Sequence, residues 1–270
     1  FEDLITLVAA YRPGPMDYIP QMIEVKHGRR PLEFATPELE PILKVTYGCI
    51  IYQEQVQQIF QRLAGYSLAQ ADIVRRAMSK KKEKVLLAER ESFINGDAER
   101  NIVGCVANGI SAEVANSLFD SMTEFAKYAF NKSHAAAYAR VAYITAWLKY
   151  YYPAEYLCVA MEYASKNKIQ GLIDECKSYG ISVLPIDINK SGASFIAEDN
   201  NIYFGITSVD GIGNIDKTIE ARKQRKFVSF ADYMLRGHID KGVTENLIKV
   251  GAFDKFCNNR KALLTAASTM

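Results

Sequence analysis

The sequence contains few of the residues from which metal sites and disulfide frameworks are built. Its 270 residues include three histidines and five cysteines, and no two cysteines form a C-x-x-C pair. Scattered cysteines in odd number argue against a zinc site and against a disulfide framework, and they favour reduced thiols in a cytosolic protein. The histidines lie far apart and offer no ligand pair at helical spacing.

Three further patterns are missing. No apolar run reaches the ~18 residues of a membrane span, so we expect a cytoplasmic protein without a membrane partner. No Gly-x-x-x-x-Gly-Lys-Ser/Thr segment is present, which excludes a P-loop nucleotide site. No Asp-x-Asp pair is available to hold two Mg²⁺ for phosphoryl transfer. We therefore predict no catalytic residue, no metal ligand and no cofactor in this chain.

Positive charge is concentrated in two regions of a chain whose net charge is only +2. Residues 62–90 carry eight lysines and arginines against three acids, and residues 222–261 carry ten against four. Such a local excess is typical of a surface that contacts a polyanion such as nucleic acid. A run of cations on a helix is also a common solvated face, so the charge alone leaves both interpretations open.

Hydrophobic periodicity predicts a mainly α-helical chain with a small α+β region at its C-terminal end. The helices are expected over residues 2–11, 53–64, 68–78, 80–95, 113–127, 133–152, 153–164, 169–179 and 215–223. Residues 13–48 hold six of the eight prolines and are predicted to be irregular. Short strands are expected over residues 182–188 and 201–205, and a domain boundary near residues 165–185.

Two motifs point to a ligand that carries both phosphate and an aromatic base. Tyr128 to His134 combine an aromatic ring, an amide, an ammonium, a hydroxyl and an imidazole before an apolar helix. With Ser133 as the expected N-cap, the helix start would offer free N–H groups to an anion. Upstream, the guanidinium groups of Arg75 and Arg76 can pair bidentately with phosphate oxygens. The structural alternative is that the aromatic rings belong to the core and that one arginine pairs with Asp72.

A different signal occupies the C-terminal part. Residues 209–213 read Val-Asp-Gly-Ile-Gly and precede a helical segment with basic residues, the pattern of a helix-hairpin-helix element. Its two glycines would let the turn expose backbone N–H groups to a DNA phosphate. A second, degenerate unit is indicated over residues 246–253. The candidate DNA-binding residues, here and in the upstream basic run, are Lys80, Lys81, Lys82, Gly211, Gly213, Arg222 and Lys223.

In chain order, the motifs closely resemble the replicative DNA polymerase III alpha subunit of bacteria. These motifs are Tyr11-Arg12-Pro13-Gly14-Pro15-Met16, Lys26-His27-Gly28, Leu39-Glu40-Pro41-Ile42-Leu43, Tyr52-Gln53-Glu54-Gln55-Val56, Leu63-Ala64-Gly65-Tyr66-Ser67, Arg75-Arg76-Ala77-Met78, Phe130-Asn131-Lys132-Ser133-His134 and Tyr152-Pro153-Ala154-Glu155. The resemblance covers essentially the whole chain. It implies a helical fingers domain over residues 1–170 and a small α+β helix-hairpin-helix segment over residues 171–270.

The resemblance also implies roles for single residues. Arg75 and Arg76 would lie near the incoming triphosphate, and Tyr128 near the incoming base. Lys132 and His134 would border the nucleotide, and His134 could help to exclude a 2′-hydroxyl. The family usually has glycine on both sides of the tyrosine, whereas this chain has Lys127 and Ala129.

The expected parent protein is a DNA-directed DNA polymerase, a nucleotidyltransferase whose palm domain carries the catalytic aspartates and Mg²⁺ outside this chain. The chain itself, a fragment that starts without a methionine, is expected to be monomeric and inactive alone. Its expected partners are primer–template DNA, the incoming dNTP and, through the parent, other replicase subunits and the sliding clamp. The alternatives are a standalone helix-hairpin-helix module that binds DNA without sequence preference, and a scaffold for docking proteins.

Overall fold

The chain divides into two compact units, Phe1–Tyr143 (unit 1) and Ile144–Met270 (unit 2), and each is described by itself. The structure is a computed structural model that describes residues 1–80, 83–125, 128–237 and 240–268. The boundary predicted between residues 170 and 171 lies inside the helix Lys166–Ser178, which belongs to unit 2.

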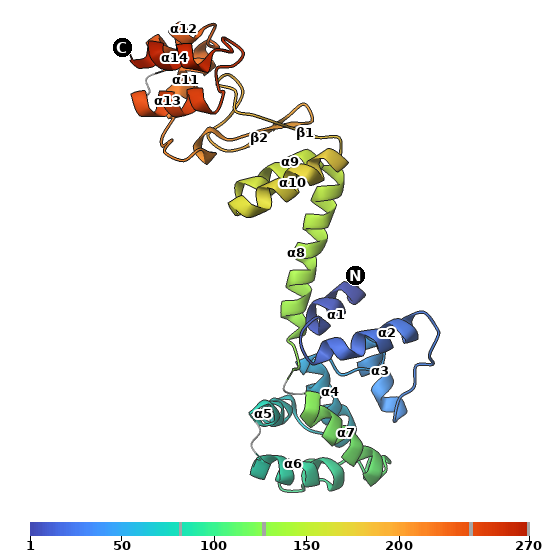
Figure 1. Cartoon of the computed structure of the whole chain (residues 1–270). Coiled ribbons are helices and arrows are strands. Elements are labelled where there is room, and N and C mark those ends of the chain that lie inside the picture. The colour runs from blue at the N-terminus through green and yellow to red at the C-terminus, as the bar shows by residue number, and fades with distance from the viewer. Residues whose placement is uncertain (81–82, 126–127, 238–239, 269–270) are drawn as a thin grey trace. The chain divides into compact units, whose positions relative to one another are not determined.

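Helices dominate both units and a small sheet occurs in unit 2, so the predicted fold class is confirmed. In chain order the elements are α1 (Glu2–Ala10), η1 (Pro15–Tyr18), α2 (Ile19–Lys26), η2 (Pro37–Leu39), α3 (Glu40–Leu43), η3 (Lys44–Thr46), α4 (Gln53–Ala64), α5 (Leu68–Ser79), α6 (Glu83–Asn95), α7 (Ala112–Phe125), α8 (Lys132–Tyr151), α9 (Pro153–Glu162), α10 (Lys166–Ser178), β1 (Ser182–Leu184), β2 (Ile196–Glu198), β3 (Asn201–Tyr203), η4 (Ile206–Ser208), α11 (Asp216–Gln224), α12 (Phe230–Arg236), α13 (Lys241–Lys249) and α14 (Arg260–Ser268) (Figure 1).

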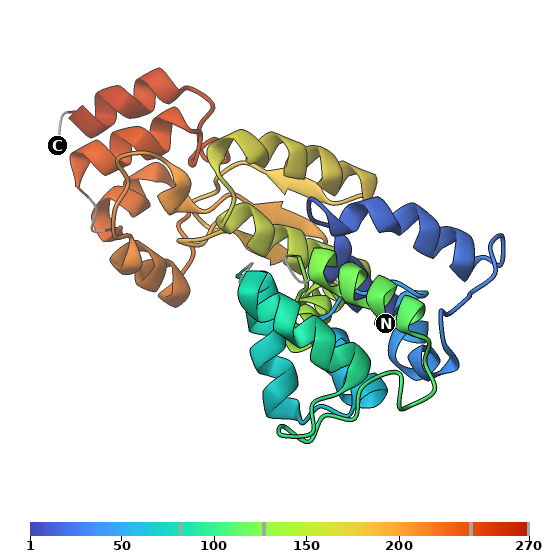
Figure 2. The ribbon, with the colours of Figure 1, turned by 90° about the horizontal axis from the view of Figure 1, so that it is seen from below.

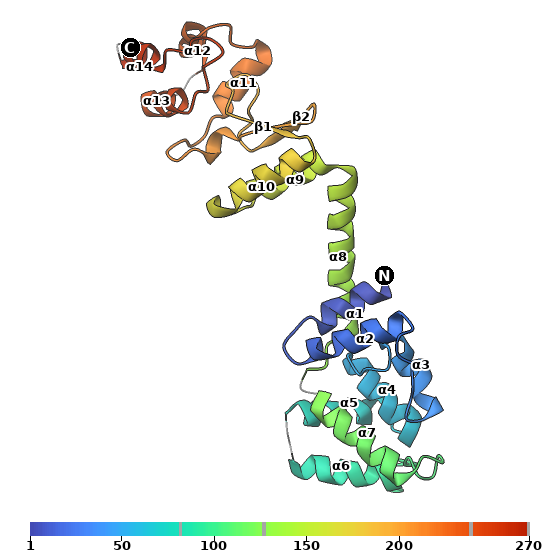
Figure 3. The ribbon, with the colours of Figure 1, turned by 45° about the vertical axis from the view of Figure 1, so that its right-hand side comes forward.

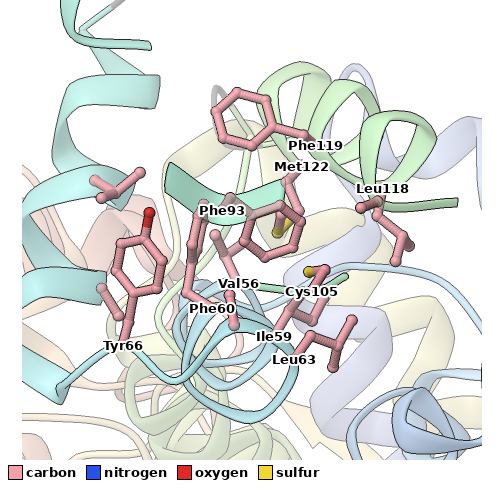
Figure 4. Packing of buried hydrophobic residues seen from close by; sticks show 14 of the residues in the cluster. Val56, Ile59, Phe60, Leu63, Tyr66, Phe93, Cys105, Leu118, Phe119 and Met122 are labelled. Carbon is pink, nitrogen blue, oxygen red and sulfur yellow. The ribbon is translucent and has the colours of Figure 1, made fainter. Parts of the chain in front are cut away.

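The larger core of unit 1 lies where α4, α5, α6 and α7 pack together (Figure 3). Four aromatic side chains meet at its centre (Figure 4). The ring centroid of Phe60 lies 5.1 Å from that of Tyr66, 4.9 Å from that of Phe93 and 6.1 Å from that of Phe119, each in an edge-to-face arrangement. Such geometry is the preferred one for aromatic pairs, and it holds α4 firmly against its neighbours.

The segment 13–48 is more helical than the sequence predicts. Short helices occupy much of it, including α2 and α3. The prolines start these helices: Pro15, Pro20, Pro37 and Pro41 each stand at one of the first two positions of an element. Proline is well tolerated there because its missing N–H would have no intrahelical acceptor. The irregular structure predicted from the proline content is therefore wrong for residues 15–26 and 37–46, whereas residues 27–36 form no helix or strand.

A smaller core in unit 1 packs the start of α8 against α1. Ala135 and Ala139 of α8 are fully buried together with Ala9 of α1 and the ring of Tyr52. The Tyr52 hydroxyl lies 3.0 Å from the Thr6 hydroxyl, which satisfies both buried polar groups. The small alanine side chains allow this close approach, and the contact fixes the first turns of α8 on unit 1.

The sheet of unit 2 has the order β1-β3-β2, with β1 parallel and β2 antiparallel to β3. Helices α9 and α10 lie beside these strands (Figure 2). Leu157, Cys176 and Ile202 are fully buried between the helices and the sheet. β1 and β3 lie where strands are predicted, whereas β2 was not predicted.

All five cysteines are free thiols, as expected.

Helices α11 to α14 surround a second core in unit 2. Its buried members include Ile212 and Ile215 before α11, Tyr233 of α12, Leu247 of α13, and Phe253. The ring centroids of Tyr233 and Phe253 lie 4.6 Å apart. This core anchors the turn that precedes α11, where the sequence predicts the DNA-binding hairpin.

Candidate nucleotide and DNA contact sites

The segment that leads into α8 has its N-cap two residues earlier than predicted. The Asn131 side-chain oxygen accepts a hydrogen bond of 2.9 Å from the backbone N–H of His134, which is the bond of an N-cap. Ser133 lies inside the helix, and its hydroxyl donates to the same Asn131 oxygen at 2.5 Å. The prediction of Ser133 as the cap is therefore wrong, because the asparagine takes this role.

The anion at this helix start is supplied by the chain itself. Both carboxylate oxygens of Glu54 accept from the backbone N–H of Lys132, at 3.1 and 3.0 Å. One of them also accepts from the Asn131 side-chain amide at 3.0 Å. The N–H groups predicted to await an external anion thus include one that Glu54 already occupies.

Contacts of Phe130 and Arg12 also hold the segment before α8. Phe130 donates its backbone N–H to the Ile51 carbonyl at 3.0 Å and accepts from the backbone of Gln53 at 2.9 Å. The Arg12 guanidinium lies 4.3 Å from the centroid of the Phe130 ring and donates to the Tyr128 carbonyl at 2.7 Å. Burial lowers the pKa of Arg12 from its usual value. Phe130 is thereby fixed as a structural aromatic residue, the alternative that the sequence left open.

The ring of Tyr128 packs against Gly14. Gly14 has φ +99°, and a Cβ added there would lie 3.1 Å from the Tyr128 ring. Only glycine combines this backbone conformation with so close an approach. The Tyr128 side chain remains 45% exposed, so part of it is open to a ligand. Ala129, which follows it, accepts a hydrogen bond of 3.1 Å from the Gln53 side chain, and Lys127 lies outside the described residues.

Lys132 and His134 leave the helix start in accessible positions. The Lys132 ammonium lies 3.2 Å from the Glu2 carboxylate and 5.4 Å from the centroid of the Tyr52 ring. The exposed His134 ring lies 5.2 Å from the ring of Phe130 and 4.7 Å from the ring of Tyr138. The ion pair of Lys132 is partly exposed, so a phosphate could compete for the ammonium.

Both arginines of the predicted phosphate pair bind one carboxylate, where the sequence suggested only one of them. Asp72 accepts from Arg75 at 2.8 Å and from Arg76 at 2.7 Å. Hydrogen bonding from Arg75 lowers the pKa of Asp72. The two arginines differ in exposure, since 15% of the Arg75 side chain and 68% of the Arg76 side chain are exposed. Arg76 is therefore the one better placed to reach a ligand.

Helix α4 connects the two motifs. On α4, Gln57 follows Gln53 by four residues and Glu54 by three, so Gln57 lies on the same face as each of them. Gln53 and Glu54 bind the segment before α8, and Gln57 donates to Asp72 at 2.8 Å. Helix α4 is thus in contact with both segments that carry the predicted dNTP-binding residues. Sequence reasoning assigned no role to Gln53 and Glu54, although both stand in a motif quoted for the resemblance.

The predicted DNA contacts are divided between the units. Lys80 is exposed at the C-terminal end of α5 in unit 1. Lys81 and Lys82 lie outside the described residues. The remaining predicted contacts, Gly211, Gly213, Arg222 and Lys223, belong to unit 2.

The predicted hairpin forms an exposed turn before α11. Gly211 is exposed and has φ +81°, a conformation that favours glycine, while Gly213 is exposed and an added Cβ would meet nothing within 4 Å. Ile212 and Ile215 are buried and anchor the turn from beneath. The turn therefore presents its glycine backbone outward, the arrangement needed for contact with a phosphate.

The two basic residues of α11 differ in availability. Arg222 donates to the Ile188 carbonyl at 2.8 Å, and burial lowers its pKa. Its guanidinium is thus engaged within unit 2. Lys223 is exposed and forms a 2.7 Å ion pair with Glu220, also exposed. Exposed ion pairs of this kind are weak, so Lys223 is the better candidate for a DNA contact.

Comparison with known proteins confirms the resemblance predicted from the motifs. Residues 1–101 match the family model of the bacterial DNA polymerase III alpha subunit finger domain, and residues 180–263 match that of a helix-hairpin-helix motif. DNA polymerase III subunit alpha of Chlamydia trachomatis is 43% identical over 272 residues, covering 98% of this chain and 21% of the relative. The same subunit of Escherichia coli K12 is 43% identical over 282 residues, with 98% and 24% coverage.

The chain spans between about a fifth and a quarter of the length of these curated relatives. Within the described ranges, no helix has both the length and the hydropathy to cross a membrane. In the same ranges, no group of three or more histidine, cysteine or acidic side chains could hold a metal ion.

Proposed function

We propose that this chain is the part of a DNA polymerase III alpha subunit that binds the incoming dNTP through unit 1 and primer–template DNA through basic surfaces of both units. The observation that supports the proposal is the set of contacts made by α4: Gln57 binds Asp72, the carboxylate that pairs with Arg76, and Gln53 and Glu54 bind the segment that carries Tyr128 and Lys132. Arg76 and Lys132 would bind the triphosphate, and Tyr128 would lie near the base. The similarity to polymerase subunits over 98% of the chain supports this assignment.

The chemistry would take place elsewhere in the full-length protein. We propose that palm aspartates would hold Mg²⁺ there, that the primer 3′-hydroxyl would take the nucleotidyl group from the dNTP with release of pyrophosphate, and that this chain alone is inactive. Contacts with other replicase subunits and the sliding clamp would likewise belong to the full-length protein. The positive side chains of unit 1 would neutralise the triphosphate and orient it, which is the main contribution a protein can make to phosphoryl transfer.

Replacement of His134 by alanine tests the proposed exclusion of ribonucleotides. The imidazole is exposed beside the ring of Phe130, where it would border the sugar. We expect His134→Ala in the full-length subunit to raise the ratio of ribo- to deoxyribonucleotide incorporation, because a side chain that excludes the 2′-hydroxyl is removed. Single-nucleotide insertion kinetics with matched rNTP and dNTP measure this ratio. An unaltered ratio would eliminate His134 from this role.

A salt series tests the proposed duplex binding by the hairpin. The affinity of the 270-residue chain for a primer–template duplex is measured by fluorescence anisotropy at increasing salt. The logarithm of the association constant should fall linearly with the logarithm of the salt concentration, with a slope of about −0.9 for each phosphate contacted. Gly213→Val should weaken binding while the melting temperature stays unchanged, because an added side chain meets open space at this position. Retained affinity in this variant would count against the hairpin as a contact.

The standalone helix-hairpin-helix module remains the second candidate, because the hairpin turn is exposed and well anchored. Combined replacement of Gly211 and Gly213 separates the two functions. A standalone module would lose all DNA affinity, whereas the polymerase assignment leaves residual, salt-sensitive affinity from the basic residues of unit 1. A chain that binds neither duplex nor dNTP at any salt concentration would instead favour a docking scaffold.

A further inference from the structure

Two helix N-termini meet at the carboxylate of Glu54. Glu54 lies in the first turn of α4, and its two oxygens lie 3.1 and 3.0 Å from the backbone nitrogen of Lys132, the first residue of α8. Each helix N-terminus carries a partial positive charge, so the two ends would repel each other without an anion between them. The charge of Glu54 therefore stabilises both helix ends at once.

The residue beside Glu54 completes the attachment. Gln53 donates to the carbonyls of Ala129 and Phe130, at 3.1 and 2.9 Å, while Glu54 accepts from Asn131 and Lys132. Two adjacent residues of α4 thus hold four consecutive residues. Gln53 donates to the carbonyls of the first two, and Glu54 accepts from N–H groups of the last two. Because the backbone is held at Ala129, Phe130 and Lys132, the direction in which the Lys132 side chain leaves it is fixed as well.

We propose that Glu54 is a positioning residue that orients Lys132 for nucleotide binding, an inference that rests on the proposed function. Glu54 would not touch the nucleotide, since its oxygens are occupied by the Lys132 N–H and the Asn131 amide. Its negative charge also keeps a phosphate away from the first amide of α8. The triphosphate would then be bound by side chains, and Lys132 is the first cationic residue of α8.

Replacement of Glu54 by glutamine in the full-length subunit tests this role. Glutamine retains one accepting oxygen but removes the charge, so we expect the KM for dNTP to rise about tenfold, the loss typical of one charge-assisted hydrogen bond, with a smaller change in kcat. Glu113→Gln is the matched control, because Glu113 also lies in the first turn of a helix, α7. This control should leave KM unchanged. If Glu54→Gln does not fold, Glu54→Asp, which shortens the side chain, takes its place.

A double-mutant cycle with Lys132→Ala separates positioning from general stability. If Glu54 acts through Lys132, its replacement should raise KM no further once Lys132 is alanine. A purely structural role would instead multiply the two increases and would overturn the inference. An unchanged KM in folded Glu54→Gln, together with a raised KM in Lys132→Ala, would overturn the role of Glu54 and leave the proposed function standing. An unchanged KM in Lys132→Ala would remove the proposed role of Lys132, and the inference with it.

Discussion

Arg76→Ala in the full-length subunit should raise the KM for dNTP by a factor between about 10 and about 100, the loss expected for a hydrogen bond between charged groups. The Arg76 side chain is 68% exposed, so its removal should leave the core of unit 1 unchanged. Asp72 would keep its bond to Arg75 and its bond to Gln57. Steady-state primer extension at varied dNTP concentration measures the effect.

The partner arginine gives a less direct test, which is why Arg76 is preferred. Only 15% of the Arg75 side chain is exposed, so Arg75→Ala should lower thermal stability together with any change in KM. Arg62→Ala is a suitable control for Arg76→Ala, because Arg62 is an exposed arginine in the last turn of α4. An unchanged KM for Arg76→Ala, equal to that of the Arg62 variant, would refute the phosphate contact.

The helices that were predicted well carry local signals in the sequence. The end of α4 is an example, since Gly65 adopts φ +77° as its C-cap and marks the boundary within the sequence itself. Ser111 precedes α7 as a residue type that favours the N-cap, and its hydroxyl accepts from the Val114 N–H at 3.3 Å. β2 was missed because a strand of three residues is too short for an alternating pattern, and its position depends on pairing with β3.

The candidate site shows where such local signals end. The residue types of Arg76, Lys132 and His134 are informative in the sequence, because their charges and donors suit a phosphate or a sugar. Glu54 lies 78 residues from Lys132, and no periodicity relates the two. Asn131 and Ser133 are both good N-caps, so composition could not choose between them. The choice follows from Glu54, which accepts from the Asn131 amide while the Asn131 oxygen caps α8.

Phe60→Ala should be the most destabilising of these substitutions in unit 1. The Phe60 side chain is fully buried and packs on three aromatic rings (Figure 4). Its truncation should therefore cost about 3–5 kcal/mol, through lost transfer free energy and a residual cavity. Hydrogen exchange of the α4 amides, followed by mass spectrometry, measures this loss as a lower free energy of opening.

The same substitution connects the core to the site, because α4 carries Phe60 and also Gln53, Glu54 and Gln57. As α4 opens more often, the segment before α8 should lose its attachments, so the KM for dNTP should rise with temperature earlier in Phe60→Ala than in the wild type. Leu87→Ala is the control, since this apolar side chain of α6 is 69% exposed and its loss should change stability by no more than about 0.5 kcal/mol. A loss below about 1 kcal/mol for Phe60→Ala would contradict the buried packing. Faster exchange of α4 with an unchanged KM would show that the site does not depend on this helix.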